Sequence, residues 1–133
     1  MEECSHLLVF CARKDAKPSI ERYIKSSEME TLRPDFAKHM RSIEINNWSE
    51  EEFLNWSTNQ AYIALGVGVT ACADLRLGHC PMSGFVPADV HKVLELPANQ
   101  WPVAYLAVGS TLDHPNPEIP KFRVSMEDLI THH

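Results

Sequence analysis

Two cationic side chains near the C-terminus have the spacing of a phosphate clasp. Lys121 and Arg123 flank Phe122, so in an extended chain both cations lie on one side and the aromatic ring lies on the other. Arginine can bind a phosphate through two parallel hydrogen bonds, and lysine adds a point charge. The pair therefore suits a phosphate monoester, with a solvated pair beside the acidic Glu118 as the alternative.

A second candidate site is the Cys-Pro-Met-Ser-Gly-Phe turn at residues 80–85. Gly84 has no side chain, so the backbone there can come close to a bound group. In the purely structural interpretation, Pro81 stops the preceding helix and Gly84 relieves strain. We expect function to reside on this turn.

Cysteine and histidine spacing does not favour a metal site. The chain has four cysteines and seven histidines, but no C-x2-C or H-x3-H pattern, so no metal ligand is predicted. Cys11 and Cys72 fall in segments predicted to be buried, which favours reduced thiols. No Ser-His-Asp or paired-carboxylate arrangement is evident, and Gly66-Val67-Gly68 lacks the third glycine of a dinucleotide-binding loop.

A long helix is expected to lead into the turn. Ser49 and Glu52 form a capping box, no proline follows until Pro81, and Gly78 is expected to be the C′ residue that stops the helix. The helix would have about 28 residues and a length of about 42 Å. Residues 61–73 carry no charge, which predicts burial on all sides, and this run is too short to cross a bilayer.

Small residues form one stripe along this helix, at Ala61, Ala64, Gly68 and Ala71. Such a stripe lets another backbone approach closely. An ordinary core helix of a monomer is the alternative, but 133 residues supply few neighbours to a helix buried all round. A subunit interface is therefore expected.

The remaining segments predict an α/β arrangement. Residues 7–12 form an apolar run, expected to be a strand covered on both faces, and residues 103–108 form a second strand. Helices are expected at 19–31 with Pro18 at the first position, from Pro34, at 88–94 and at 125–130, whereas the three prolines of residues 113–120 predict an extended arm. Residues 1–133 are expected to form a single domain, and the final His132-His133 is consistent with a tag remnant.

Several segments, in the right order, carry a resemblance to the FMN-dependent nitroreductase family. They are residues 5–12, 56–66, 77–85, 101–109 and 120–123. The family's N-terminal Arg-Ser-x-Arg region, which grips the flavin phosphate, has no counterpart here. The resemblance thus implies an α/β (α+β), nitroreductase-like fold truncated at the N-terminus, with a long central dimerisation helix and a small covered sheet.

The resemblance also implies an FMN site. Pro81, Met82, Ser83 and Gly84 would lie against the flavin ring, with the amide of Ser83 or Gly84 directed at N5, and Lys121 and Arg123 would bind the phosphate. Ser83 stands where the family usually has a glutamate. No catalytic side chain is expected, since the flavin itself carries the electrons.

Two functions follow as hypotheses. In the first, the chain is an FMN-dependent oxidoreductase that passes electrons from NAD(P)H to nitroaromatics or quinones, as a homodimer. In the second, it is a truncated relative without flavin, which acts as a binding or interaction module or needs a second chain to complete its site.

Charge and composition exclude other classes of partner. A net charge of −6 and a pI near 5.6 leave no basic stripe for nucleic acid or an anionic membrane. No signal peptide or membrane span is evident, so a cytoplasmic protein is expected.

Overall fold

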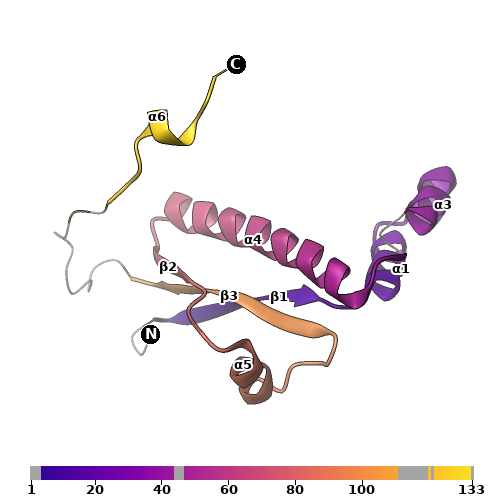
Figure 1. Cartoon of the computed structure of the whole chain (residues 1–133), viewed down its shortest axis with the longest axis horizontal. Helices are drawn as coiled ribbons and strands as arrows, with labels where there is room; N and C mark the ends of the chain where they lie inside the picture. Colours follow the sequence, from indigo (N-terminus) through magenta and orange to yellow (C-terminus); the bar gives the residue numbers. More distant parts are fainter. Residues whose placement is uncertain (1–3, 44–46, 111–119, 121, 133) are drawn as a thin grey trace.

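A three-stranded antiparallel sheet forms the base of the fold (Figure 1). The computed structural model describes residues 4–43, 47–110, 120 and 122–132. Strands β1 (His6–Arg13) and β2 (Gly78–Met82) both pair with the central strand β3 (Gln100–Gly109). The two predicted strands are confirmed within a mixed helix and strand fold, while the third comes from a segment that we expected to be a turn.

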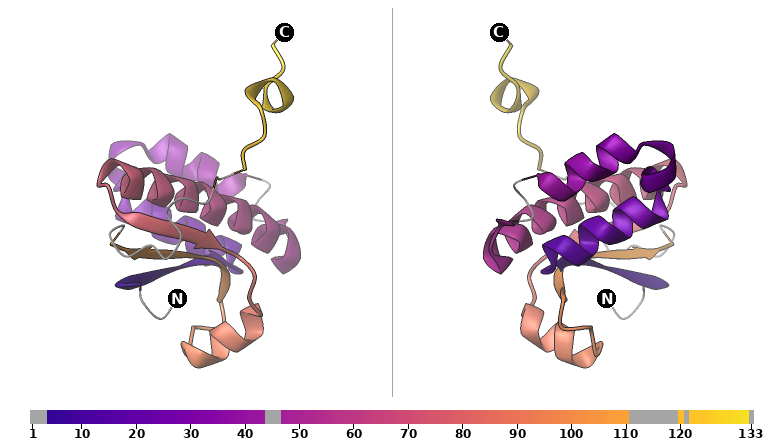
Figure 2. Two further views of the ribbon diagram at one scale, coloured as in Figure 1. Left: turned by 90° about the vertical axis from the view of Figure 1, so that its left-hand side faces the viewer. Right: turned by 90° about the vertical axis from the view of Figure 1, so that its right-hand side faces the viewer.

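The long helix α4 (Glu50–Asp74) lies across one face of this sheet (Figures 1 and 2). Its capping box is confirmed: the Ser49 hydroxyl accepts from the Glu52 amide at 3.2 Å, and the Glu52 carboxylate accepts from the Ser49 amide at 2.8 Å. In the described part of the chain, no helix is long and apolar enough to span a membrane.

The predicted end of α4 at Gly78 is wrong. The helix ends at Asp74, and the C′ residue is Arg76, whose φ of 56° is left-handed. The Arg76 amide donates to the Ala73 carbonyl at 3.1 Å and the Leu77 amide donates to the Cys72 carbonyl at 2.8 Å. These two bonds form a Schellman motif, so backbone geometry stops the helix without a glycine.

The predicted burial of α4 on all sides is also wrong within this chain. Ile63 and Val67 are exposed, with Val67 at 65%, whereas Leu65 and Cys72 are buried. The helix packs on a single sheet, which can cover only one of its faces.

The small-residue stripe does not present one common face to a partner helix. Ala61 is buried, and a Cβ on Gly68 would lie 3.2 Å from Leu106 Cδ2 of the sheet, whereas Ala64 and Ala71 are exposed. Small residues at Ala61 and Gly68 therefore let α4 approach its own sheet.

Strand β1 is not covered on both faces. It lies at a margin of the sheet, and Leu7 and Leu8 are 41% and 46% exposed. The continuous apolar run indicated a central strand, but an antiparallel edge strand can carry the same residues with one side open.

Three short helices form a lobe beside the N-terminal end of α4. They are α1 (Ala16–Ser26), α2 (Met29–Leu32) and α3 (Pro34–Ser42). The single helix expected at residues 19–31 is divided at Glu28, which is left-handed with a φ of 53°, and Pro18 is the third residue of α1 rather than the first. Their core consists of Ile20, Ile24, Ala37 and Phe53.

Asp15 ties this lobe to the sheet. Its carboxylate accepts from Arg13 Nε and Nη2 at 2.8 and 2.6 Å and from Asn99 Nδ2 at 2.8 Å. Desolvation raises the pKa of Asp15, but the hydrogen bonds from Arg13 and Asn99, with the charge of Arg13, leave it lowered. The Arg13 amide also donates to Ser57 Oγ of α4 at 2.7 Å, so three elements meet here.

Two short helices complete the described fold. Helix α5 (Pro87–Val93) lies within one residue of the expected range of 88–94, and α6 (Met126–Leu129) is capped by the Ser125 hydroxyl, which accepts from the Asp128 amide at 3.2 Å. The expected extended arm at residues 113–120 lies outside the described residues, apart from Pro120.

Candidate functional site

Strand β2 places the predicted Pro81–Gly84 segment at one margin of the sheet. Pro81 pairs with Leu106 and Met82 pairs with Tyr105. The strand can start at Gly78 because that residue lacks a side chain: a Cβ there would lie 2.9 Å from the Ser110 carbonyl oxygen. Pro81 and Met82 are therefore strand residues, and only Ser83 and Gly84 form the turn.

The turn after β2 presents two backbone donors to solvent. Ser83 and Gly84 are exposed, and among the described residues neither amide donates a hydrogen bond, whereas the Phe85 amide donates to the Ser83 carbonyl at 3.0 Å. A Cβ on Gly84 would have no atom within 4 Å. The Ser83 and Gly84 amides can donate hydrogen bonds to an acceptor atom of a flat group placed against the turn.

An aromatic pair adjoins this turn. The rings of Phe85 and Tyr105 stack with centroids 4.1 Å apart and planes 18° apart. Tyr105 is buried, and burial, followed by the charge of Cys11, raises its pKa. Burial also raises the pKa of Cys11, so at neutral pH neither group supplies an anion to the site.

Sequence reasoning did not identify this stack. The missing signal was strand register. Once Met82 is known to pair with Tyr105, Phe85, three residues further along the chain, comes within reach of the tyrosine ring.

The two halves of the predicted site are not in contact in the described structure. Arg123 is exposed, and its Nη1 donates to the neighbouring Phe122 carbonyl at 2.7 Å. Lys121 lies outside the described residues. The structure therefore brings together Pro81, Met82, Ser83 and Gly84 but does not join them to the basic pair.

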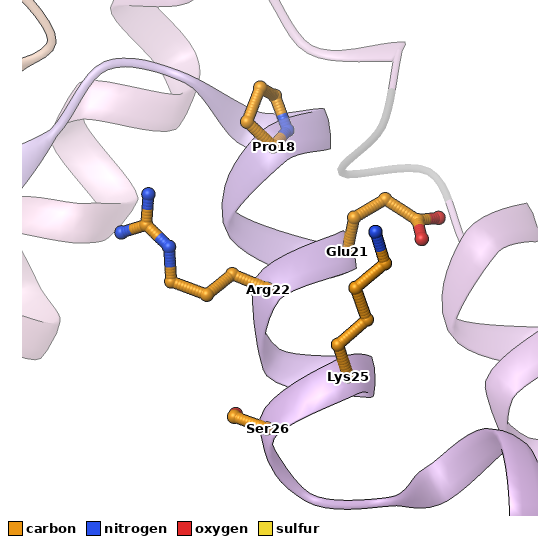
Figure 3. Close-up of a pocket in the computed structure, with 5 residues that line it drawn as sticks. All are labelled: Pro18, Glu21, Arg22, Lys25 and Ser26. Atoms are coloured by element: carbon orange, nitrogen blue, oxygen red, sulfur yellow. The ribbon is translucent and has the colours of Figure 1, made fainter.

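A shallow cavity of about 520 Å³ lies elsewhere, on α1. It is lined by Pro18, Glu21, Arg22, Lys25 and Ser26, and Figure 3 shows Arg22 extending to one side of the helix while Glu21 and Lys25 extend to the other. Side chains that diverge from one helix do not enclose a ligand, and no predicted site residue lines this cavity. We therefore place the candidate site at β2.

Metal and disulfide chemistry find no support in the described part of the chain. No group of three or more histidine, cysteine, aspartate or glutamate side chains there could hold a metal ion. Cys4, Cys11, Cys72 and Cys80 are all free thiols.

Two curated proteins resemble this chain over nearly all of its length. A Staphylococcus haemolyticus protein named as an NAD(P)H nitroreductase and the major NAD(P)H-flavin oxidoreductase of Aliivibrio fischeri are each 29% identical to it over 147 aligned residues. Each alignment covers 98% of this chain and 64% of the relative. The chain thus spans less than two thirds of the length of these relatives.

Solved structures show the same fold. The nitroreductase ydfN from Bacillus subtilis superposes with a TM-score of 0.75 at 15% identity, covering 98% of this chain and 64% of that one. A nitroreductase family protein from Streptococcus pneumoniae gives a TM-score of 0.65 at 14% identity, covering 98% and 65%. The family model for nitroreductases matches residues 12–110, which is most of the sequence, and the chain belongs to the nitroreductase family.

Proposed function

We propose that this chain carries the flavin-contacting part of an FMN-dependent oxidoreductase that moves electrons from NAD(P)H to nitroaromatic or quinone acceptors. The observation that carries the proposal is the pair of free amides at Ser83 and Gly84 beside open space. Family membership and the flavin oxidoreductase among the relatives support the choice of cofactor. Bound FMN would supply hydride chemistry at N5 of its ring.

The chain's own residues would hold the cofactor rather than react with it. The Ser83 and Gly84 amides would donate to an acceptor of the ring, Pro81 and Met82 would line its edge, and the Phe85–Tyr105 stack would keep the turn in place. No side-chain acid or base is needed, in line with the raised pKa of Tyr105. Catalysis would then depend on position and on exclusion of water.

Arg123, with Lys121, would bind the phosphate of FMN. Arg123 is exposed, so its guanidinium can reach a phosphate without losing a buried contact. Since the described structure does not join this segment to β2, the clasp would have to close when the cofactor binds.

The proposal includes a single-domain homodimer in the cytoplasm. Helix α4 contributes to both core clusters, through Phe53 in one and through Leu65 and Cys72 in the other, which favours one domain. The exposed Ile63 and Val67 favour a second subunit, and four free thiols suit a reducing compartment.

Titration with FMN and with riboflavin tests the ring and phosphate contacts separately. Gly84→Ala keeps the amide and, with no protein atom within 4 Å of the new Cβ, should fold normally but bind both flavins more weakly. Gly66→Ala, at a second glycine with equally open surroundings, is the matched control. Arg123→Ala should weaken the binding of FMN about ten- to a hundredfold and leave the binding of riboflavin nearly unchanged.

The alternative is a nitroreductase-like module without flavin. The observation that favours it is that the chain spans only 64% of its relatives. A purified protein that is colourless and takes up neither FMN nor riboflavin would establish this alternative, whereas flavin absorbance that survives gel filtration would rule it out.

A further inference from the structure

We propose that the Tyr105 hydroxyl is a third hydrogen-bond donor of the candidate site and binds the ring of the flavin together with the Ser83 and Gly84 amides. The inference rests on the proposed function and deepens it, because it adds a side-chain donor to ring contacts that otherwise come from the backbone. Tyr105 would then be a cofactor-binding residue as well as a support for Phe85.

Tyr105 is a buried polar side chain whose hydroxyl has no partner in the protein. The residue is only 8% exposed, and in the described part of the chain its hydroxyl makes no hydrogen bond. Within the same residues, no buried side-chain oxygen or nitrogen lacks a partner, so the hydroxyl oxygen reaches the surface although its ring is covered. Buried tyrosines usually find a partner for this group. A free hydroxyl at this position can bind a group that comes from outside the chain.

Strand geometry puts Tyr105 on the side of the sheet where the turn lies. Its neighbour Leu106 faces Gly68 of α4, and side chains alternate along a strand, so Tyr105 points to the face remote from α4. Met82 is its Cα partner on β2, and residues directly opposite each other share a face. Figure 1 shows the chain passing from β2 to α5 on this side of the sheet. The tyrosine therefore lies against the segment that leads from β2 into the turn.

The neighbours of Tyr105 restrict its ring to one position. Val9 and Met82 are its Cα partners on the two adjacent strands, and the Phe85 ring stacks on it with the centroids 4.1 Å apart. A tyrosine side chain has only two rotatable bonds. Since the ring is already held, binding a ligand through the hydroxyl costs little further conformational freedom.

The three proposed contacts can all donate hydrogen bonds. The Ser83 and Gly84 amides donate to no group among the described residues, and a phenol hydroxyl can act as a donor too. Burial, followed by the charge of Cys11, raises the pKa of Tyr105, so the hydroxyl keeps its proton at neutral pH. Several donors around one turn suit a flat ring whose edge carries several oxygen and nitrogen acceptors, and the flavin ring has such an edge.

Titration of the flavin-free protein with FMN and with riboflavin tests the contact. Tyr105→Phe keeps the ring and its stack with Phe85 and removes only the hydroxyl. It should weaken the binding of both flavins about two- to tenfold, the scale of one neutral hydrogen bond. The factor should be the same for both, because the phosphate is not involved. Tyr23→Phe makes the same change at a tyrosine of α1 that is 47% exposed; this matched control should alter neither affinity.

The reduction potential of the bound flavin is a second readout, which a purely structural role would not move. Reduction adds electron density to the acceptors of the ring, so a donor should hold the reduced flavin more tightly than the oxidised one. If the hydroxyl favours the reduced form about tenfold, Tyr105→Phe should lower the potential by about 30 mV. Thermal unfolding of the flavin-free variant should stay close to that of the native protein, since the aromatic stack is kept.

Three results would overturn the Tyr105 contact. Native affinities for both flavins in Tyr105→Phe would remove the hydroxyl from the site and leave the proposed function standing. Weaker binding with an equally large loss of stability would assign Tyr105 to folding alone. A native protein that binds neither flavin would overturn both the contact and the proposed function.

Discussion

Two glycines of α4 should respond in opposite directions to substitution. Gly66 is exposed, and a Cβ added there has no atom within 4 Å. Glycine inside a helix costs about 1 kcal/mol relative to alanine. Gly66→Ala should therefore stabilise the fold by about 1 kcal/mol.

Gly68, half a turn away, faces the sheet. A Cβ there would lie 3.2 Å from Leu106 Cδ2 and 3.5 Å from Phe10 Cζ, and Leu106 is fully buried. Gly68→Leu places three further carbons in this space. Overpacking costs about 1–3 kcal/mol, of which helix propensity offsets about 0.8 kcal/mol, so we expect a net loss of about 0.2–2.2 kcal/mol.

Thermal unfolding followed by circular dichroism measures both effects. For 133 residues, an unfolding entropy of about 2.1 cal/mol/K per residue converts 1 kcal/mol into about 3–4 °C. Gly66→Ala should raise Tm by about that amount, and Gly68→Leu should lower it by about 1–8 °C. If Gly68→Leu kept its native Tm and instead lost its dimer, α4 would contact a partner helix at Gly68 and the packing described above would be wrong.

Four further substitutions probe the elements that hold the site. Ser49→Ala removes the α4 cap and should cost about 0.5–2 kcal/mol in chemical denaturation. Phe53→Ala empties a fully buried position of the helical lobe and should cost about 3–5 kcal/mol in the same assay. Gly78→Ala forces a Cβ to 2.9 Å from the Ser110 carbonyl oxygen and should lower Tm, with β2 amides exchanging faster. Asp15→Ala should destabilise the fold by about 1.5–3 kcal/mol at neutral pH; since the folded pKa of Asp15 is lowered, this advantage of the native protein should disappear as pH falls below about 4.

Local sequence signals identified most elements but not their surroundings. The capping box at Ser49, Pro34 at the start of α3 and the apolar run of β1 are short-range patterns, and each produced the expected element. Burial depends on what lies across from an element. An apolar helix with small residues looks the same whether a sheet or a second helix covers it, so the faces of α4 could not be assigned from sequence.

The misassigned glycine illustrates the same limit. Gly78 is a standard helix stop by local rules, yet the structure uses it for the close approach of Ser110 and leaves the left-handed position to Arg76. Only the pairing with β3 distinguishes these two uses. In the candidate site, the residues Pro81–Gly84 are contiguous, so the sequence alone could group them. The Phe85–Tyr105 stack could be found only once the register of β2 on β3 was known. The role of Arg123 in phosphate binding stays a prediction.

The central position of β3 determines the order in which the chain can acquire its structure. His6 pairs with Val108 and Arg13 pairs with Gln100, so β1 must wait until β3 has been synthesised. At about 5–20 residues per second, that interval during translation is about 5–20 s. The α1–α3 lobe depends on contacts between near neighbours in sequence and can form early, whereas the sheet closes a long loop and should form late. Throughout this interval the apolar residues of β1 lack their partner strand, so we expect chaperones that bind extended apolar chain to recognise the nascent β1 segment.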